Sequence, residues 1–440
     1  MTEFERLLTG LCMVAAYSLW VGYLFWKHKG KHLLRQHTQE SKILIAWASQ
    51  TGTAQALAEA YAANHSEFKH GVLMQLSAIS PERLKEFERA LFVVSTYGHG
   101  EPPDNGRSFF KALNRTRRNE TELSHLEYEV VALGDSKYPH FCAFGEHIDK
   151  RLNALGASPV APLVKLDHSK GEETAALAQY SSASVAVPAY EDFTLIRRRQ
   201  LNSGPRHPLF EIDLYAGHNA QQWQAGDILD VLPMNTSEEI ARSYTIASVS
   251  SESHIIKLIV RLAIKEDGSQ GLASGWLTQQ LKINDTVKAK LHVNPACHLT
   301  LNNKPLLLIA AGSGLAGIRA QWMQAAEQQH TAPVYVLFGE RTRELDDILS
   351  EVIPAQALNA ANVTVKRVFS RCPDHPMYVQ QALQQSKDAL RDVVNNDGQI
   401  YVCGSYDGMG EGVHHTLIRM LGEEQVQQLT DSHRYHRDVY

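Results

Sequence analysis

The chain has 440 residues and a formal net charge of −5, with 44% hydrophobic and 21% charged residues. This length exceeds one ordinary domain, so we expect two or three domains of globular composition. The mildly acidic balance lacks long basic blocks, which argues against nucleic-acid binding. The five cysteines are scattered and form no CxxC pair, so neither a disulfide framework nor a metal site is expected.

An uncharged, largely apolar stretch, residues 7–26, lies near the N-terminus and is about as long as a membrane-spanning helix. Lys27, Lys29 and Lys31 follow it, so the positive-inside rule puts the rest of the chain on the cytoplasmic side. A cleaved signal peptide is the alternative, but no small-residue cleavage site follows. We therefore expect a single-pass membrane anchor, in the inner membrane if the protein is bacterial, with cytoplasmic domains and a membrane-associated partner.

From residue 42 onwards, short apolar strands alternate with helical segments, which predicts a doubly wound α/β domain over residues 42–179. Its helices are expected at 54–64, 81–88, 108–115 and 144–155. Residues 180–190 have the composition of a linker. Short strands separated by turns then predict an antiparallel β-barrel over residues 191–301. Renewed alternation predicts a second α/β domain over residues 302–440.

The first predicted strand, residues 43–48, leads into a phosphate-binding type of loop. Its small hydroxyl residues and glycine open an alanine-rich helix, where loop N–H groups and the helix N-terminus attract an anion. The loop has no lysine of the triphosphate-binding kind, which favours a monophosphate. A capped helix with an incidental motif is the alternative. The loop consists of Ser49, Gln50, Thr51, Gly52, Thr53 and Ala54.

Two more loops at the same predicted sheet edge carry aromatic residues. Tyr97 and Gly98 follow one strand, and Gly134, Asp135 and Tyr138 follow the next. Open α/β sheets bind ligands at the carboxyl ends of their strands. We therefore expect the tyrosines to stack on a planar ring, although loop tyrosines are often packing residues.

These three loops, with the strings SQTGTA, STYGHGEPPDN and ALGDSKYPHFC, resemble the FMN loops of the diflavin reductase family. The resemblance implies that the 49–54 loop holds the FMN phosphate and that Tyr97 and Tyr138 flank the isoalloxazine ring. It implies that Gly98, Gly134 and Asp135 shape the loops. Asp167 falls where the family has an acidic residue near the flavin.

The barrel and the second α/β region carry further motifs. On one predicted strand, Arg242 offers a bidentate grip on a pyrophosphate, Tyr244 a ring to cover a flavin, and Thr245 a hydroxyl group. That pattern alone is common by chance. Gly271, Ala273 and Ser274 open a helical segment and supply a second phosphate cradle. A glycine loop with Gly312 and Gly314 follows the strand at 306–311.

These elements resemble the ferredoxin–NADP reductase module of diflavin reductases, which implies FAD in the barrel and NADPH on the second α/β domain. The residues 437–440 are similar to the ending of bacterial sulfite reductase flavoprotein subunits. Thr245, Cys403 and Asp438 are thereby expected beside the hydride path, with Glu340 as a further candidate, and Tyr440 over the flavin. A buried core thiol and a frayed tail are the alternatives. The implied NADPH-binding residues are Gly312, Gly314, Arg319, Ser370, Arg371, Tyr378 and Gln380.

The chain also departs from the family. Gly317 stands in place of a proline, Pro376 in place of a lysine and Ser405 in place of an aspartate. Only residues 232–241 occupy the place of a large helical insert, so the spacing of the two flavin domains cannot be copied from relatives.

The expected activity is an NADPH-dependent flavoprotein reductase that relays electrons from NADPH to FAD, then FMN, then a one-electron acceptor with a haem or metal centre. A hinge is expected near residues 180–187. The alternatives are a sulfite reductase component, a ferric or cytochrome reductase, and a non-catalytic flavin-binding module.

Overall fold

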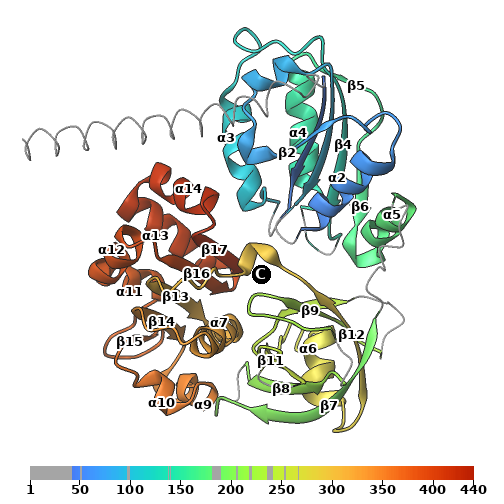
Figure 1. The fold of residues 1–440 in the computed structure, drawn as a ribbon. Coiled ribbons are helices and arrows are strands. Elements are labelled where there is room, and N and C mark those ends of the chain that lie inside the picture. The colour runs from blue at the N-terminus through green and yellow to red at the C-terminus, as the bar shows by residue number, and fades with distance from the viewer. Residues whose placement is uncertain are drawn as a thin grey trace, which may run out of the picture.

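The computed structural model describes residues 42–49, 52–96, 100–136, 138, 140–180, 190–204, 207–217, 221–234, 241–251, 254–265 and 267–440. Three sheets organise these residues, and each sheet has its own set of helices (Figure 1). The sheets lie within the three predicted domain ranges. Most of the predicted linker, residues 181–189, lies outside the described residues.

The first sheet is parallel, with the order β2–β1–β3–β4–β5 and β6 beside β4. Its central strands are apolar on both faces because helices cover both faces. On β3, Phe92 packs towards α3 and α4, whereas Leu91 and Val93 pack towards α2. The strands are β1 (Ile43–Ala48), β2 (Val72–Gln75), β3 (Arg89–Ser95), β4 (Glu127–Gly134), β5 (Ser158–Pro159) and β6 (Val164–Asp167). The helices are α2 (Thr53–Asn64), α3 (Arg107–Arg115), α4 (Ala143–Ala154) and α5 (Glu172–Tyr180).

One predicted helix of this domain is wrong. In place of a helix at 81–88, the chain forms only a short 3₁₀ turn, Glu82–Glu86, after Pro81. Phe87 is extended and buried, and leads directly into β3. Its burial therefore outweighs the helical preference of the preceding residues.

The second sheet is antiparallel, with the order β10–β9–β12–β7–β8–β11. Ile246, just after β10, bridges Leu258 of β11, which closes the sheet into the predicted barrel. β9 and β10 are hairpin neighbours, so the short 232–241 segment links adjacent strands. The strands are β7 (Glu191–Gln200), β8 (Leu209–Tyr215), β9 (Ile228–Leu232), β10 (Arg242–Thr245), β11 (Ile255–Arg261) and β12 (Thr286–His292). The short helix α6 (Leu272–Gly275) lies between β11 and β12 in the chain.

The third sheet is parallel, with the order β15–β14–β13–β16–β17. Its last strand consists of the chain's final residues, so the C-terminal segment is part of the sheet. The strands are β13 (Leu306–Ala311), β14 (Val334–Glu340), β15 (Val363–Phe369), β16 (Gln399–Gly404) and β17 (Tyr435–Val439). The helices are α7 (Leu315–Glu327), α8 (Arg343–Asp346), α9 (Leu349–Val352), α10 (Ala355–Leu358), α11 (Val379–Gln385), α12 (Lys387–Asn395), α13 (Glu411–Leu421) and α14 (Glu423–Asp431).

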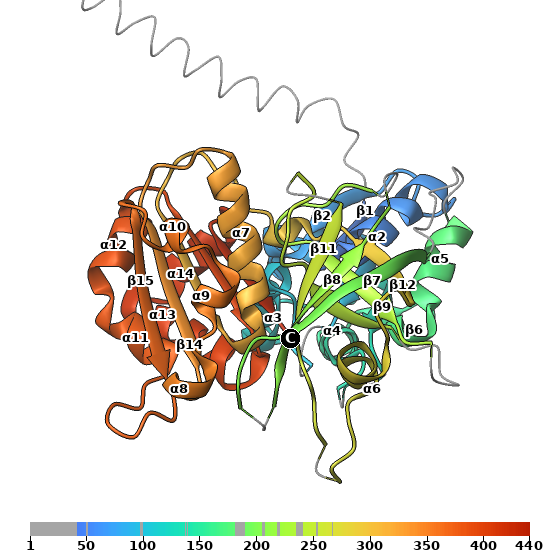
Figure 2. The same ribbon diagram turned by 90° about the horizontal axis from the view of Figure 1, so that it is seen from below.

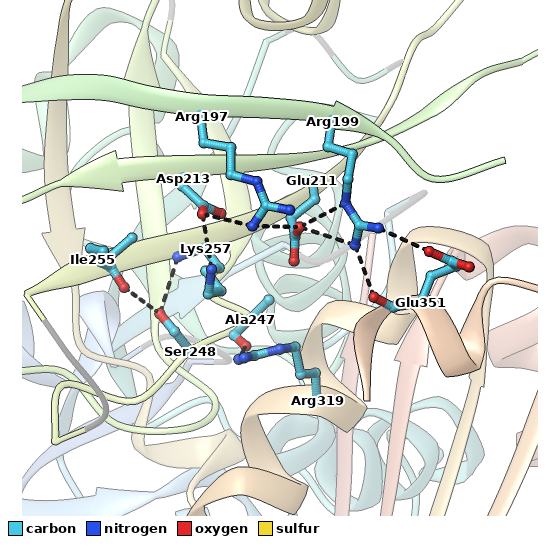
Figure 3. Close-up of polar contacts among 10 residues, drawn as sticks. All are labelled: Arg197, Arg199, Glu211, Asp213, Ala247, Ser248, Ile255, Lys257, Arg319 and Glu351. Atoms are coloured by element: carbon cyan, nitrogen blue, oxygen red, sulfur yellow. Dashed lines mark hydrogen bonds and ion pairs between the residues drawn. The ribbon is translucent and has the colours of Figure 1, made fainter. Parts of the chain in front are cut away.

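The barrel and the C-terminal domain share one hydrophobic core. Leu209, Ala247 and Ile259 of the barrel belong to the same buried cluster as Leu308 and Trp322. Polar contacts reinforce this junction: Arg199 on β7 bridges Glu211 on β8 and Glu351 on α9, and Arg319 on α7 donates to the carbonyl oxygen of Ala247 (Figure 3). These two domains therefore form one packed unit.

The N-terminal domain, in contrast, has cores made only of its own residues. It meets the C-terminal domain through polar side chains. Lys111 on α3 pairs with Glu423 on α14, and Arg107 Nη1 lies 3.2 Å from His414 Nε2 on α13. Figures 1 and 2 show the C-terminal residue at the junction of all three domains.

The prediction of an N-terminal membrane helix is corrected here. Within the described part of the chain, no helix has both the length and the apolar character needed to cross a bilayer. The longest described helix, α7, has 13 residues, well short of the roughly 20 that a span requires. Residues 7–26 themselves lie outside the described residues. We therefore do not retain the anchor, the single-pass membrane localisation or the membrane-associated partner.

Candidate functional site

The carboxyl edge of the first sheet faces the barrel and the chain's last residues across a cavity of about 240 Å³. Predicted FMN-loop residues and barrel residues thus line the same space, although they are far apart in sequence. The predicted FAD residues Arg242, Tyr244 and Thr245 do not line this cavity, although their neighbour Ser243 does. Its lining includes Thr53, Thr96, Gly134, Asp135 and Tyr138 from the first domain, Ile228, Asp230 and Ser243 from the barrel, and Tyr440.

The first phosphate loop has the expected strand–loop–helix form. Ser49, at the end of β1, is buried, and its Oγ accepts a hydrogen bond from the N–H of Ala54 at 3.2 Å. Gly52, just before α2, has a φ of 88°, which glycine adopts without strain. These features suit an anion held at the helix N-terminus. Gln50 and Thr51 lie outside the described residues.

The next two loops meet at the cavity. A Cβ at Gly134 would lie 2.8 Å from the backbone nitrogen of Cys142, so only glycine allows this close approach. Tyr138 is 49% exposed and lines the cavity. Its ring is therefore accessible to a planar ligand. Tyr97 and Gly98 lie outside the described residues.

Asp167, at the end of β6, holds the loop after β4 in place. Its Oδ1 accepts hydrogen bonds from the N–H groups of Ser136 and Ser169, both at 3.1 Å, and it is 1% exposed. Burial raises the pKa of this carboxyl group, but the hydrogen bonds outweigh burial and keep its pKa well below the usual range. Asp167 does not line the cavity, so its visible role is to position the loop that carries Asp135 and Tyr138.

The barrel presents the predicted FAD residues on one short strand. Arg242, Tyr244 and Thr245 lie on β10, which pairs with β9 in antiparallel register. Burial raises the pKa of Tyr244, and the charge of Arg242 lowers it in part. Burial likewise raises the pKa of Tyr138 in the first domain, and the charge of Arg242 lowers it in part.

The second predicted phosphate cradle consists of Gly271, which lies just before α6, and of Ala273 and Ser274 within α6. Ser274 Oγ accepts a hydrogen bond from the N–H of Ala263 at 3.2 Å, and a Cβ at Gly271 would lie 2.7 Å from that oxygen. Ala273 is buried beside it. The cradle is thus held by local contacts within the barrel.

The buried carboxylate of Asp438 gathers two other predicted hydride-path residues, Thr245 and Cys403, and one residue that was not predicted, Tyr401. Asp438 Oδ2 accepts hydrogen bonds from Thr245 Oγ1 at 2.8 Å, Tyr401 OH at 2.9 Å and Cys403 Sγ at 3.5 Å. The four residues come from β10, β16 and β17, so the cluster exists only where barrel and C-terminal sheet meet. Burial raises the pKa of Asp438, although the three hydrogen bonds lower it in part.

Cys403 is held in its neutral form by the same surroundings. Burial, together with the negative charge of Asp438, raises the pKa of its thiol well above the ordinary value. A neutral thiol is a hydrogen-bond donor to Asp438, and its sulfur is not poised as a nucleophile.

Gly317, a departure from the family pattern, has a packing reason. A Cβ at this position would lie 2.3 Å from Tyr401 OH and 2.8 Å from Cys403 Sγ. The glycine therefore makes room for the tyrosine that donates to Asp438. Tyr401 was not predicted from the sequence, because a tyrosine within an apolar strand is typical of a core residue.

The chain's last residue is fixed at its backbone. Tyr440 N–H donates to Gly404 O at 3.1 Å, and its carbonyl oxygen accepts from Tyr406 N–H at 2.8 Å. Its hydroxyl contacts Ser313 Oγ at 2.8 Å, yet the residue is 52% exposed. The C-terminal residue is therefore not frayed. Its backbone is held by hydrogen bonds, and its aromatic ring lies at the cavity.

A second cavity, of about 540 Å³, opens at the carboxyl edge of the third sheet. The expected residues Gly312, Ser370, Tyr378 and Gln380 line it, together with Arg261 and Arg341, which the sequence analysis did not identify. A Cβ at Gly314 would lie 2.0 Å from Cys403 O, so this loop must pack directly on β16. Such a glycine loop before α7 is suited to a dinucleotide pyrophosphate.

Three predicted residues have other positions. Arg319 faces the barrel, and neither Arg319 nor Arg371 lines the cavity. Glu340 lines it, but its carboxylate pairs with Arg261. Arg371 lies at the exposed rim, where its N–H donates to Arg341 O. No sequence signal marked Arg261, because it belongs to the barrel rather than to the nucleotide motif.

Comparison with known proteins agrees with this architecture. Residues 45–179 match the flavodoxin family, and residues 308–415 match the oxidoreductase NAD-binding domain family. The first match covers the parallel sheet with the FMN-type loops, and the second covers the glycine loop and most of the third sheet.

Several curated proteins are similar over most of the chain. The sulfite reductase [NADPH] flavoprotein alpha-component of Shewanella oneidensis is 25% identical, covering 90% of this chain and 89% of its own. Its counterpart in Thiocapsa roseopersicina is 26% identical over 86% and 84%, and NADPH oxidoreductase A of Dictyostelium discoideum is 21% identical over 94% and 91%. The Shewanella alignment runs over 549 positions, so that relative has residues without a counterpart here.

A flavodoxin domain and an NAD-binding oxidoreductase domain in one chain define a flavin-dependent oxidoreductase. The fold, the two domain matches and the relatives together support membership of the diflavin reductase family.

Proposed function

We propose that this protein relays electrons from NADPH through FAD and FMN to a one-electron acceptor protein. It is an NADPH-dependent diflavin reductase, and its cofactors are FMN, FAD and NADPH. The observation that carries the proposal is the convergence of Thr245, Tyr401 and Cys403 on Asp438, next to a cavity that FMN-loop and barrel residues share.

The bound cofactors supply hydride acceptance and single-electron transfer, and the protein supplies position and electrostatics. Thr245 and Asp438 would orient the FAD ring, and buried Cys403 would exclude water beside it. Tyr440 would cover the FAD ring, and its side chain would have to move before nicotinamide could reach the flavin. Arg242 would hold the FAD pyrophosphate, and the 49–54 loop would hold the FMN phosphate.

The arrangement of the domains supports an opening motion. In the structure, the carboxyl edge of the FMN domain faces the barrel, which suits transfer between the flavins but covers that edge. An acceptor protein needs access to it, so the FMN domain must separate from the rest. Its separate cores and polar contacts with the C-terminal domain favour such separation.

The acceptor is a haem protein or another protein with a metal centre. A reductase component of a sulfite reductase is the second candidate, because relatives with that name align with about nine-tenths of this chain. A non-catalytic flavin-binding module is disfavoured by the intact cluster around Asp438.

The purified protein tests the proposal directly. We expect equimolar FMN and FAD, bleaching of flavin absorbance by NADPH in stopped flow, and NADPH-driven reduction of ferricyanide and cytochrome c. Protein that lacks either flavin after reconstitution, or flavin that NADPH fails to bleach, would contradict the relay. Adding a sulfite reductase haemoprotein tests the second candidate function, because sulfite is reduced only if this protein can pass electrons to that haemoprotein.

A further inference from the structure

We infer that helix α3 of the FMN domain is a docking surface for the electron acceptor, and that this acceptor presents an acidic surface. Three residues of α3, Arg107, Lys111 and Arg115, form a basic ridge. The ridge contacts the C-terminal domain in the structure and binds the acceptor once the FMN domain has separated. The inference rests on the proposed function, because it names the chemistry of the acceptor in that relay.

The spacing of its residues creates the basic ridge. Arg107, Lys111 and Arg115 are four residues apart on one helix, so their side chains lie on one face. The opposite face carries Phe109 and Leu113, which are buried in the core of the domain. The side chain of Arg107 is 14% exposed and that of Lys111 is 44% exposed, and Arg115 is also exposed. The helix therefore turns a row of positive charge away from its own domain.

In the structure this ridge faces carboxylates of the C-terminal domain (Figure 1). Lys111 pairs with Glu423, which together with Glu424 lies in the first turn of α14. The hydrogen bond and the charge of Lys111 lower the pKa of Glu423, and the charge of Arg115 lowers it further. Two residues of the ridge thus act on one acidic residue of the other domain. The kind of surface that the ridge accepts is therefore one with carboxylates.

The first residue of the ridge differs from the other two. Arg107 pairs with Glu101, which lies in the loop before α3, so its charge is compensated within the FMN domain. Lys111 has its printed partner on the C-terminal domain instead. When the two domains separate, Lys111 and Arg115 are therefore the residues of the ridge that attract a new acidic partner.

The ridge begins at the edge of the sheet where FMN is proposed to bind. Asn105, two residues before α3, accepts a hydrogen bond through its Oδ1 from the N–H of Ser49 in the phosphate loop, at 3.1 Å. From Arg107 to Arg115 the helix rises by about 12 Å, at about 1.5 Å per residue. A protein interface covers about 800 Å² on each partner, so one acceptor can cover the flavin edge and the ridge together.

The contacts of the ridge with the C-terminal domain are weak enough to be exchanged. The side chains of Lys111 and Glu423 are 44% and 55% exposed, and an exposed ion pair contributes at most about 1 kcal/mol. Separation of the FMN domain uncovers the flavin edge and the ridge at the same time. An acidic acceptor is then attracted to the ridge by its charge, whereas a basic acceptor is repelled.

Cytochrome c with two opposite surface charges tests this inference, because both forms have the same haem group. Native cytochrome c has a basic surface, and succinylation of its lysines makes the surface acidic. The flavin-loaded protein is reduced with NADPH without oxygen and then mixed with each ferric cytochrome in stopped flow, where one electron passes to each haem. We expect the succinylated form to have the larger second-order rate constant at low salt, and this difference to shrink as ionic strength rises.

The variant Arg115→Glu is compared with the matched control Lys69→Glu. Lys69 is exposed, and its neighbour Phe68 packs with α2 on the other side of the first sheet from α3. Both variants change the charge of the domain equally. We expect Arg115→Glu to lower the rate constant for the succinylated cytochrome about 10-fold at low salt and to raise that for the native one, while Lys69→Glu leaves both within about twofold.

Three results would count against these claims. A larger rate constant for native cytochrome c at low salt would contradict an acidic acceptor surface. Equal effects of Arg115→Glu and Lys69→Glu would show that the ridge is not the docking surface. If NADPH does not reduce the flavins, the proposed function fails, and the docking test is then run after reduction with dithionite. Arg115→Gln, which removes one charge, replaces Arg115→Glu if that variant loses FMN, and it should give a smaller change in the same direction.

Discussion

Asp438 shows at the scale of one residue how a shared acceptor organises a site. Its Oδ2 receives three donors from two domains, so each donor's orientation depends on this carboxylate. Asp438→Asn should slow flavin reduction by NADPH about 10- to 100-fold. This factor corresponds to the free energy that hydrogen bonds to a charged group contribute. Stopped-flow measurement of flavin bleaching checks this, and an unchanged rate would exclude a role for Asp438 in hydride transfer.

The Asp438→Asn variant also tests how this carboxyl group affects the stability of the folded protein. Because burial raises the pKa of Asp438 in the folded state, folding favours the protonated form. The stability that this provides is present below the unfolded-state pKa and is lost as pH rises through the folded-state pKa. Ionisation of this buried carboxyl group therefore destabilises the folded state, and Asp438→Asn should have a Tm equal to or above that of the parent. Calorimetry at pH 7 would contradict this if the variant melted several degrees lower.

Tyr440 is the second residue whose role can be isolated. Only its side chain is free to move, because its backbone bonds to Gly404 and Tyr406. Replacing the ring with Tyr440→Ala should uncover the flavin face and raise kcat/KM for NADH, since a ligand that binds weakly no longer has to displace the ring. Ser313→Ala, which removes only the hydroxyl contact, is the matched control. Unchanged preference between NADH and NADPH in Tyr440→Ala would rule out the covering role.

At the scale of elements, the junction between α7 and β16 is set by glycine. Gly317→Ala would place a methyl group against Tyr401 and Cys403, and we expect a loss of about 1–3 kcal/mol of unfolding free energy from overpacking. Denaturant unfolding of the flavin-bound protein measures this loss.

A double-mutant cycle identifies its cause. Tyr401→Phe removes the hydroxyl that would clash, so the combination Gly317→Ala with Tyr401→Phe should lose less stability than the sum of the single changes. If the stability losses of the two single changes were strictly additive, a clash with the Tyr401 hydroxyl would not explain why this chain has glycine where the family has proline at position 317.

At the scale of the whole molecule, charged contacts connect the FMN domain to the C-terminal domain. The Lys111–Glu423 pair is exposed, so it contributes at most about 1 kcal/mol and weakens with salt. Lys111→Glu should slow electron transfer from FAD to FMN and favour the open form, while transfer to ferricyanide from FAD persists. Lys111→Glu combined with Glu423→Lys restores the opposite charges and should restore the rate. Flavin-to-flavin transfer that is indifferent to both variants and to ionic strength would refute this contact.

Long apolar runs in the sequence predicted the strands better than short ones did. Buried parallel strands such as β1, β3 and β4 have continuous apolar runs, and the loops after them carry glycine and aromatic residues, so their identity was readable. The edge strand β2 was not, because Val72 and Leu73 stay exposed and its apolar signal is short. The helix expected at 81–88 failed because burial of Phe87 decides the local conformation. The apolar stretch at 7–26 lies outside the described residues, and none of the described helices is long and apolar enough to cross a bilayer.

The amino-acid sequence by itself predicted the order of the three sheets along the chain and the strand–glycine–helix form of the loops, and it grouped Thr245, Cys403 and Asp438 at one site. The roles of these residues stay predictions. These depend on short-range patterns, in which a strand, a glycine and a helix follow one another. Only the tertiary structure decided which distant residues share an atom or a cavity: Tyr401 at Asp438, Arg261 at Gly312, and residues of the first domain and the barrel around one cavity. Such contacts join residues from different sheets, and their geometry arises from the packing of domains, which no local pattern encodes.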